Sequence, residues 1–502
     1  MNKAVRRVAF ILALAFAALV AQLSWVQVFS ASKLAENPAN RRLLIKEYSI
    51  ARGSIVAGDL VIAESRKTND NLKYQRFYPQ KALFGEISGY YSILFGRYGL
   101  EQSYNDYLVG AGPQDRFSAI VDDLLGRDRR GDSLILTIDP ALQKIAKQKL
   151  GNQRGAAVAI DPETGEILAM YASPSYDPSA LTSHNLSTVR KAWDKLNADP
   201  LHPLLSRATQ QRYPPGSTFK IVVAAAALQD GIKPTDRFSN PRALKLPLTN
   251  KPLPNFTGHA CAGGSTISMA IGLRESCNTT FAQIGMKVGA EKLNAMAQKF
   301  GFGGPPDGFD LPASPSCLVA VPGGECGDPR GLDAPQTAFS SIGQFNVRVT
   351  PLQMAVVAAT VANMGRVPRP HTVREIRDPS AKVIKRFDDQ PSDPIYSDYA
   401  ATQLHKMMID VVSNGTGRPA FAALSSDVQR KIRGEMGGKT GTAQTGVEGQ
   451  PPHVWFIAFA PGIAVAVVVE NGGVLADLAT GGKVAGPIAA ALIQAKVREG
   501  KS

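Results

Sequence analysis

The chain begins with an apolar run long enough to cross a membrane. Residues 8–29 carry no charge, and the first fourteen of them are all apolar. A helix of this length reaches about 33 Å, close to the roughly 30 Å hydrocarbon core of a bilayer. The run is preceded by three basic residues, Lys3, Arg6 and Arg7. Basic flanks stay in the cytoplasm, so we predict a cytoplasmic tail at 1–7, a transmembrane anchor at 8–29 and an extracytoplasmic remainder.

A cleaved signal peptide is the alternative interpretation of this run. Small residues follow it at Ser30, Ala31 and Ser32. The apolar stretch is long for a signal peptide, however, and no A-x-A pattern closes it. An uncleaved anchor in the cytoplasmic membrane is therefore the expectation.

The rest of the pattern alternates between short strand-like runs and buried helical runs. Strand-like patterns occur at Ser54–Ala63, Ser133–Asp139, Gly155–Asp161, Glu166–Ser173, Gly437–Gln444, Val454–Ala460 and Ala464–Glu470. Buried helical patterns occur at Ile221–Leu228, Leu352–Asn363 and Pro487–Val497, and the Gly- and Pro-rich segment Gly301–Gln336 predicts irregular structure. Strands and helices are segregated rather than alternating, which favours an α+β fold with an antiparallel sheet. We expect a non-catalytic amino-terminal domain at 30–152 and a catalytic domain at 153–495.

Composition excludes several classes and leaves the partner open. The 502 residues are 44% hydrophobic, and the 46 Gly and 34 Pro show no G-X-Y period, so disordered and collagen-like chains are excluded. A net charge of +14 fits a solvated basic face as well as a binding role. We expect no nucleic-acid partner.

Four cysteines could pair outside the cytoplasm. Cys261, Cys277, Cys317 and Cys326 permit three connectivities. Short loops favour Cys261 with Cys277 and Cys317 with Cys326, a hypothesis that the sequence alone leaves open.

Three short motifs carry the candidate chemistry. Ser217 and Lys220 form S-x-x-K at a predicted helix start, so that an amine one turn away can deprotonate the hydroxyl. Ser276 and Asn278 form S-x-N 59 residues later, and Lys439 begins the K-T-G motif on a predicted strand. S-x-x-K and S-x-N each recur elsewhere in the chain, so the order and setting of all three carry the signal.

With these motifs, the chain resembles the penicillin-recognising serine acyltransferases, the penicillin-binding proteins and serine β-lactamases. The resemblance to class B penicillin-binding proteins, and among them to the penicillin-binding protein A type of actinobacteria, covers nearly the whole exported chain. It extends through Arg52–Ile55, Gly99–Glu101 with Tyr104, Leu136–Asp139, Thr350–Ala355, and Trp455–Phe456 with Phe459–Pro461. One departure is Phe345, where family members often have a glycine.

The resemblance implies a penicillin-recognising transpeptidase domain, with an antiparallel sheet, flanking helices and an all-α subdomain, behind an amino-terminal pedestal domain. It implies that Ser217 is the acyl-accepting nucleophile and Lys220 its base. Ser276 would relay a proton to the leaving amine beside Lys439, and Asn278 would bind the peptide amide of the substrate.

For the K-T-G strand, the resemblance implies that Lys439 and Thr440 hold the terminal carboxylate of the substrate. Gly441 would leave room for substrate along the strand edge. The backbone amides of Ser217 and Thr442 would form the oxyanion hole. The charge of Lys439 would also lower the pKa of Lys220.

The implied reaction is acyl transfer from D-alanyl-D-alanine, which cross-links peptidoglycan stem peptides, and β-lactams would acylate the same serine. No metal or cofactor is needed for it, and the six histidines show no helical i, i+4 pair; His453 alone is a candidate for a place near the cleft. The alternatives are a D,D-carboxypeptidase or β-lactamase-like hydrolase, and a non-catalytic β-lactam sensor. Family resemblance also implies a polytopic glycosyltransferase partner.

Overall fold

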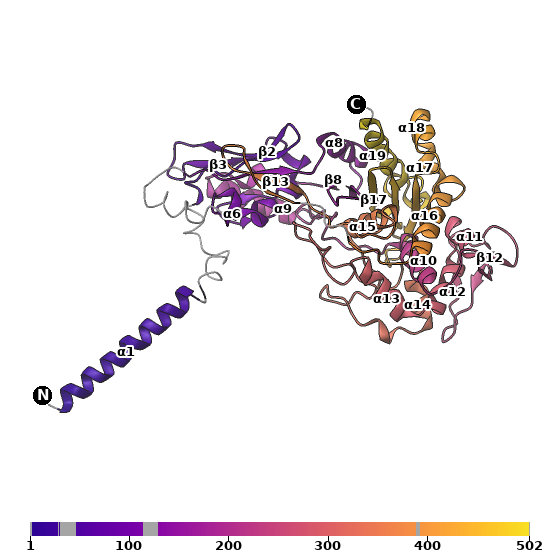
Figure 1. Cartoon of the computed structure of the whole chain (residues 1–502), viewed down its shortest axis with the longest axis horizontal. Helices are drawn as coiled ribbons and strands as arrows, with labels where there is room; N and C mark the ends of the chain where they lie inside the picture. Colours follow the sequence, from indigo (N-terminus) through magenta and orange to yellow (C-terminus); the bar gives the residue numbers. More distant parts are fainter. Residues whose placement is uncertain (1–2, 29, 31–46, 114–128, 388–391, 501–502) are drawn as a thin grey trace.

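The structure is a computed structural model that describes residues 3–28, 30, 47–113, 129–387 and 392–500 (Figure 1). Helix α1, Lys3–Val28, is long and apolar enough over Val5–Gln27 to cross a membrane. The predicted anchor is thus helical up to Val28, and residue 29 lies outside the described residues, as does most of the following segment, 31–46.

The larger part of the molecule is built on a five-stranded, fully antiparallel sheet. Its order is β15 (Gly437–Ala443), β16 (His453–Ala460), β17 (Ile463–Val469), β7 (Gly155–Ile160) and β8 (Ile167–Ser173). The predicted hairpin and the three predicted carboxy-terminal strands are all confirmed within a residue or two. Their buried runs have few polar positions because helices cover both faces of the sheet.

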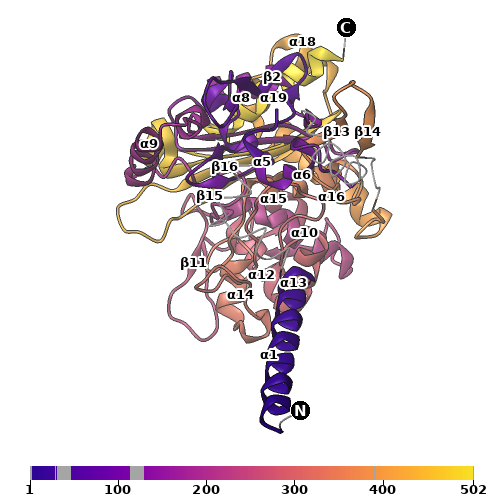
Figure 2. The same cartoon turned by 90° about the vertical axis from the view of Figure 1, so that its left-hand side faces the viewer.

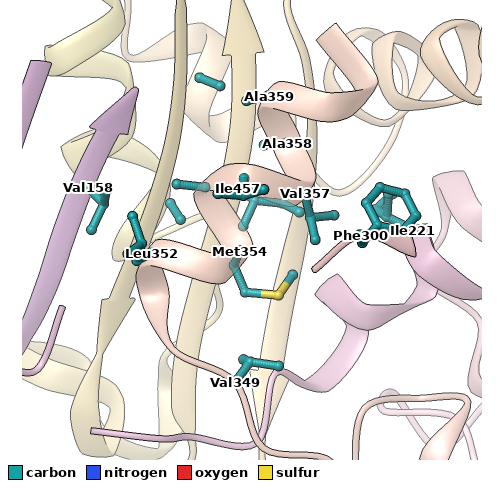
Figure 3. Packing of buried hydrophobic residues seen from close by; sticks show 14 of the residues in the cluster. Val158, Ile221, Phe300, Val349, Leu352, Met354, Val357, Ala358, Ala359 and Ile457 are labelled. Atoms are coloured by element: carbon teal, nitrogen blue, oxygen red, sulfur yellow. The ribbon is translucent and has the colours of Figure 1, made fainter. Parts of the chain in front are cut away.

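One face of the sheet packs against α15 (Pro351–Ala362), with α10 (Lys220–Gln229) behind it. Figure 3 shows Leu352, Met354 and Val357 of α15 lying between the strand residues Val158 and Ile457 and the side of α10. Because α15 is surrounded on all sides, it is apolar around its whole circumference. The predicted helix at Leu352–Asn363 is confirmed.

The opposite face carries a second hydrophobic cluster. The strand residues next in sequence to Val158 and Ile457, namely Ala157 and Phe456, belong to this cluster and pack toward α8 (Pro140–Leu150) and α19 (Ala485–Glu499). The predicted carboxy-terminal helix is confirmed and begins two residues earlier than expected. Two short helices complete this layer, α17 (Arg418–Ala422) and α18 (Ser426–Lys431).

A mostly helical region adjoins the edge strand β15 and holds most of the remaining helices of the catalytic part. They are α11 (Met269–Arg274), α12 (Asn278–Val288), α13 (Ala290–Lys299), α14 (Ala334–Ser340) and α16 (Asp398–Ser413). Two small ribbons lie in the same stretch of chain, β9 (Arg237–Ser239) with β12 (Thr266–Ser268), and β10 (Ala243–Leu244) with β11 (Leu253–Pro254). The α+β fold class with an antiparallel sheet is confirmed.

A second sheet of six strands draws on two distant parts of the sequence. Its order is β14 (Val383–Arg386), β13 (Val373–Arg377), β6 (Ser133–Leu136), β1 (Ile55–Ala57), β2 (Leu60–Lys67) and β3 (Tyr74–Phe77). Two of these strands come from within the range assigned to the catalytic domain, and Figure 1 and Figure 2 show β13 beside the amino-terminal elements. The boundaries 30–152 and 153–495 stay a prediction. The single strand expected at Ser54–Ala63 is wrong, because Gly58, at φ 52°, turns the chain into the hairpin β1–β2.

Buried charges tie this second sheet to its neighbouring helices. Arg52 Nη2 and Arg76 Nε donate to the two carboxylate oxygens of Glu101 at 2.8 and 2.6 Å. Burial alone would raise the pKa of Glu101, but Arg76 and Arg52 hold it below its usual value. Arg52 and Glu101 belong to the motifs of the family resemblance, and in the structure they form a buried ion pair. Their role is structural, since removing either partner would leave an uncompensated buried charge.

The other regular elements are short, except for α9. They are the helices α4 (Gly85–Ser88), α5 (Leu100–Ser103), α6 (Asn105–Leu108) and α9 (Leu186–Ala198), the ribbon β4 (Tyr91–Ser92) with β5 (Gly96–Arg97), and the 3₁₀ helices η1 (Lys81–Leu83), η2 (Pro178–Leu181), η3 (Gly216–Phe219), η4 (Pro329–Gly331) and η5 (Glu470–Leu478).

Candidate active site

Ser217 lies in the 3₁₀ turn η3, which runs directly into α10. Gly216 takes a positive φ of 54°, and its N–H donates to the carbonyl of Gly343 at 3.0 Å. Thr218 Oγ1 donates to the carbonyl of Pro215 at 2.8 Å, which closes the turn. Ser217 stays partly exposed, whereas Lys220, at the first residue of α10, is fully buried. The predicted helix start is confirmed.

Ser276 and Asn278 lie where α11 ends and α12 begins, and they meet Lys220 there. Lys220 Nζ donates to the backbone carbonyl of Ser276 at 2.7 Å and to Asn278 Oδ1 at 2.9 Å. Ser276 has a positive φ of 62°, uncommon for a residue with a side chain. Strain of this kind persists where the surroundings impose it and often marks a functional site.

Lys439 approaches the same serine from the edge strand β15. Its Nζ donates to Ser276 Oγ at 2.7 Å and to the carbonyl of Thr440 at 2.9 Å. Ser276 therefore connects the two lysines, with its carbonyl on Lys220 and its hydroxyl on Lys439. Lys220, the S-x-N segment and Lys439 thus contact one another, whereas among the described residues Lys220 forms no hydrogen bond to Ser217 Oγ, so the direct contact expected within S-x-x-K stays a prediction.

Both lysines have lowered pKa values. Burial lowers the pKa of Lys220 well below its usual value, and the nearby charge of Lys439 lowers it further. Burial lowers the pKa of Lys439 to about 7. Because the charge of Lys439 adds to burial in lowering the pKa of Lys220, a protonated Lys439 favours a neutral Lys220 beside it.

A cleft of about 310 Å³ opens onto these residues. Its lining includes five of the predicted residues, Ser217, Ser276, Asn278, Thr440 and Thr442. Lys220 and Lys439 are buried behind this surface. The side chain of Asn278 is already engaged, because its Nδ2 donates to the carbonyl of Pro254 at 3.1 Å while its Oδ1 accepts from Lys220.

Several lining residues were not predicted from the sequence. They are Asn255, Phe256, Thr257, Cys261, Glu275, Thr416, Thr480, Gly481 and Gly482. Thr416 shares a hydrogen bond of 2.8 Å with Thr440 through their hydroxyls. These residues lie on segments that only the fold places at the cleft. Only the run of small residues Thr480–Gly482 is a local sequence pattern that could have indicated a part of the cleft wall.

Gly441 has a different neighbour from the one expected. A Cβ at this position would lie 2.9 Å from the carbonyl oxygen of Pro215, from Thr218 Cγ2 and from Trp455 Cβ. The missing side chain therefore lets β15 pack closely against the turn that bears Ser217. The expected reason, clearance for a substrate at the strand edge, is corrected by this geometry.

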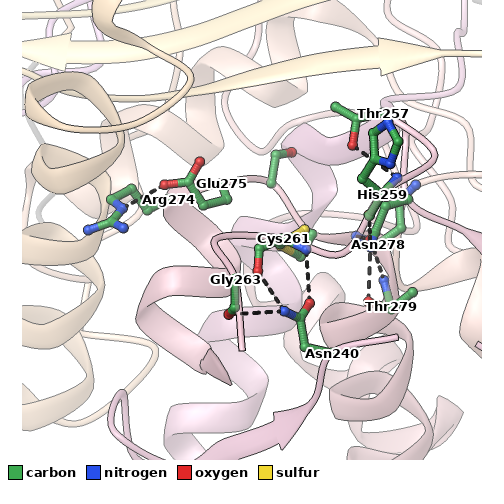
Figure 4. The surroundings of a disulfide bond; sticks show 12 residues. Asn240, Thr257, His259, Cys261, Gly263, Arg274, Glu275, Asn278 and Thr279 are labelled. Carbon is green, nitrogen blue, oxygen red and sulfur yellow. Dashed lines mark hydrogen bonds and ion pairs between the residues drawn. A yellow bond between two sulfur atoms is a disulfide. The ribbon is translucent and has the colours of Figure 1, made fainter. Parts of the chain in front are cut away.

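A disulfide lies beside the S-x-N segment (Figure 4). Cys277, between Ser276 and Asn278, is bonded to Cys261, which lines the cleft. Asn240 holds the Cys261 backbone from both sides, since its Nδ2 donates to the carbonyl at 2.6 Å and its Oδ1 accepts from the N–H at 3.0 Å. The second bridge joins Cys317 and Cys326, so the hypothesis of two short loops is confirmed.

His453 does not line the cleft. Its ring packs edge-on against Tyr213, with centroids 5.3 Å apart, and its Nδ1 accepts from the N–H of Asn471 at 3.2 Å. The possibility of a place in the cleft is therefore not supported. Within the described residues, no group of three or more His, Cys, Asp or Glu side chains is arranged to hold a metal ion.

The site is that of a serine enzyme that reacts through a covalent acyl-enzyme. It has a serine at a helix start, a buried lysine of lowered pKa on the same helix, and a second lysine on the adjoining edge strand. Two family profiles match the chain. "Penicillin binding protein transpeptidase domain" matches residues 155–494, and "Penicillin binding protein A dimerisation domain" matches residues 52–134. The chain belongs to the penicillin-binding protein transpeptidase family, in class B.

Relatives support the same assignment over the full length. The peptidoglycan D,D-transpeptidase PbpA of Mycolicibacterium smegmatis is 38% identical over 100% of both chains. The peptidoglycan D,D-transpeptidase MrdA of Escherichia coli is 30% identical over 75% of this chain and 62% of its own. Among solved structures, the imipenem acyl-enzyme complex of penicillin-binding protein A from M. tuberculosis superposes with a TM-score of 0.79 at 34% identity, covering 90% of this chain and 100% of that one.

Proposed function

We propose that this protein is a peptidoglycan D,D-transpeptidase that cross-links stem peptides through an acyl-enzyme on Ser217. One observation carries the proposal: Ser276 accepts hydrogen bonds from two buried lysines, Lys220 and Lys439. Ser276 and Ser217 line the same cleft. Curated relatives with the same family membership are D,D-transpeptidases, and a structural relative forms acyl-enzymes with β-lactams.

In the first half of the reaction, Ser217 Oγ attacks the carbonyl of the penultimate D-alanine while neutral Lys220 accepts the proton of the Ser217 hydroxyl. The C–N bond to the last D-alanine breaks, and the proton that Lys220 accepted passes through the Ser276 hydroxyl to the leaving nitrogen, which returns Lys220 to its neutral form. The hydrogen bond from Lys439 to Ser276 Oγ supports this route. Lys439 remains the cation that favours a carboxylate at the cleft wall.

Substrate contacts follow from the same arrangement. Thr440 and Thr442 present their side chains to the cleft, and the terminal carboxylate of the substrate would lie against Thr440. The backbone amides of Ser217 and Thr442 would hold the developing oxyanion, a contribution of about 3 to 4 kcal/mol per donor. Asn278 would bind the peptide amide after exchanging its hydrogen bond with Pro254 for one to the substrate.

In the second half, an amine of a neighbouring stem peptide replaces the serine and forms the cross-link. A D,D-carboxypeptidase would use water at this step, and a sensor would stop at the acyl-enzyme. Full-length protein in detergent, supplied with a donor strand and an amine-bearing acceptor strand, should yield cross-linked dimer by mass spectrometry. Shortened donor without dimer would indicate the hydrolase, and acylated protein without either product would indicate the sensor.

We also propose the topology and a partner for the anchor. The short basic end of α1 would lie in the cytoplasm and residues from about 30 onward outside. A polytopic glycosyltransferase would extend the glycan that this protein cross-links, in contact with α1 and the amino-terminal domain.

The test of that partnership must keep the second sheet intact. Removing residues 1–150 would take away β1, β2, β3 and β6 and leave β13 paired with β14 alone. Exchange of residues 1–29 for an unrelated single span avoids this damage. We expect the exchange to abolish co-purification of the glycosyltransferase, whereas full co-purification would show that α1 is not part of the contact.

A further inference from the structure

A polar hollow lies beside the segment that leads into the catalytic turn. It has a volume of about 440 Å³ and is lined mainly by polar side chains, those of Gln210, Gln211, Arg212, Ser314, Asn346 and Arg348. Arg212 precedes Ser217 by five residues. Tyr213 and Val349 exchange both backbone hydrogen bonds at 2.9 Å, which fixes Arg212 and Arg348 on adjoining strands of chain.

Both guanidinium groups are anchored in a way that leaves donors free. Arg212 Nη1 donates to the carbonyl of Gly324 at 2.8 Å, and Arg348 Nη1 donates to the carbonyls of Phe345 and Val347, each at 2.9 Å. Among the described residues, neither arginine has an ion-pair partner, and no hydrogen bond is formed by Nε or Nη2 of either group. Each group is therefore held in place with further N–H donors available to a ligand.

The two charges also act on each other. Burial lowers the pKa of Arg348, and the charge of Arg212 lowers it further. Like charges held together in a partly buried hollow are unfavourable unless an anion joins them. Glu470, the residue after β17, is a buried carboxylate, but it already binds Arg154, Arg207 and Tyr213 and therefore does not neutralise the two arginines.

Arg212 directly precedes Tyr213, whose ring packs against that of His453 with the centroids 5.3 Å apart. His453 pairs with Ala443, the last residue of β15. In the proposed reaction the substrate carboxylate lies at Thr440 and the reacting carbonyl at Thr442, so the preceding peptide residues would pass Ala443 and His453, beside the segment that bears Arg212.

We propose that Arg212 and Arg348 form a subsite for a carboxylate carried by the stem peptide on the amino-terminal side of D-alanyl-D-alanine. This inference rests on the proposed function, because it takes the direction of the substrate from it. A guanidinium binds a carboxylate through two parallel N–H donors, which adds orientation to the charge attraction. The subsite would favour acidic donor peptides over neutral ones and hold the chain in register with Ser217.

Competition against fluorescent penicillin tests the subsite. Full-length protein in detergent is incubated with one of three peptides ending in D-alanyl-D-alanine. One has a side-chain carboxylate at the residue before this pair, one has it a residue earlier, and the third has amides at both positions. We expect one acidic peptide to halve the labelling rate at about a tenfold lower concentration than the neutral peptide, the preference that one charged hydrogen bond gives.

Variants assign that preference to the two arginines. Arg212→Gln and Arg348→Gln should each reduce it to near parity and leave labelling in the absence of peptide unchanged. Arg330→Gln removes an arginine of the same region that is paired with Asp328 at the surface, and should keep the preference. Arg348→Lys is the second variant if the glutamine protein fails to fold, and it should retain part of the preference because it keeps the charge.

Three outcomes would overturn the proposal. The first is equal protection of wild-type protein by acidic and neutral peptides, and the second is a preference that survives both glutamine substitutions. The third is protection by inorganic phosphate in the absence of any carboxylate preference, which would assign the arginines to a phosphate-bearing ligand. Loss of penicillin labelling in folded wild-type protein would instead contradict the proposed function.

Discussion

At the scale of single residues, the chemistry depends on two lysines that the fold buries in one site. Lys220 and Lys439 both contact Ser276, and neither is exposed to solvent. Burial penalises the charge of each, and their proximity ensures that only one of them is readily charged. A base and a carboxylate-attracting cation are thus obtained from the same residue type.

Lys220→Ala should slow acylation of Ser217 by a β-lactam by several orders of magnitude, because the nucleophile loses its base. The second-order rate constant for fluorescent penicillin measures it, with the exposed Lys233→Ala as the control. A fall of less than about tenfold in a folded variant would assign the base to another group.

The pH dependence of acylation follows from the same two pKa values. Lys220 is active without its proton, and its pKa is well below the usual value, so the rate should rise as this amine deprotonates. Lys439 attracts the carboxylate while protonated, and its pKa is about 7, so the rate should fall as pH increases above 7. The fall of the second-order rate constant above pH 7 is the part of the profile that reports on Lys439. A steady rise up to pH 10 would contradict the role of Lys439.

The sequence predicted the identities of the motif residues and left their detailed contacts open. Which oxygen of Ser276 meets which lysine depends on the positive φ of that residue, and no local pattern reveals it. Thr416 could not be predicted at all, because its place beside Thr440 comes from the end of α16 meeting the edge strand.

At the scale of elements, the close approach of the catalytic turn to β15 sets the width of the site. Gly441→Ala should push these elements apart, because its Cβ would meet the turn and Trp455 at 2.9 Å. We expect acylation to fall roughly a hundredfold, the loss that misplacement of about 1 Å can bring. Gly304→Ala is the control, since a Cβ there meets nothing within 4 Å. Normal acylation by the Gly441 variant would show that the turn can yield.

The two disulfides offer a matched pair at this scale. Each closes a short loop, with sequence separations of 16 and 9. Loss of either should lower the free energy of unfolding by about 3 kcal/mol. Only the pair Cys261→Ala with Cys277→Ala should also slow acylation, by roughly tenfold or more, because Cys277 lies between Ser276 and Asn278.

Thermal unfolding and the penicillin rate constant, measured on both double variants, separate the two effects. Equal slowing by loss of the Cys317–Cys326 bridge would mean that general destabilisation, and not the position of the S-x-N segment, determines the rate.

Elements with long buried runs were predictable, and those with short or polar runs were not. The strands β7, β8, β16 and β17 are nearly all apolar, because both faces are covered. By contrast, β13 and the edge strand β14 contain several charged residues, and β13 pairs with β6, which lies more than two hundred residues away in the sequence. Propensity cannot identify a strand of this kind, because its stability comes from tertiary pairing.

At the scale of the whole molecule, the second sheet connects the amino-terminal part to the catalytic part. Its strands β6 and β13 pair with each other although they come from residues 133–136 and 373–377. Thr137 Oγ1 donates to the carbonyl of Ile167 at 2.7 Å and thereby contacts the edge strand β8 of the catalytic sheet. The two parts are therefore joined by paired strands and by this side-chain hydrogen bond.

The central claim is that Ser217 is the residue that becomes acylated. Intact-mass measurement of the full-length protein after exposure to penicillin, followed by peptide mapping, tests it most directly. We predict one adduct per chain, located on Ser217, and no adduct on a folded Ser217→Ala variant. An adduct that maps to another residue, or one that persists in the Ser217→Ala variant, would contradict it.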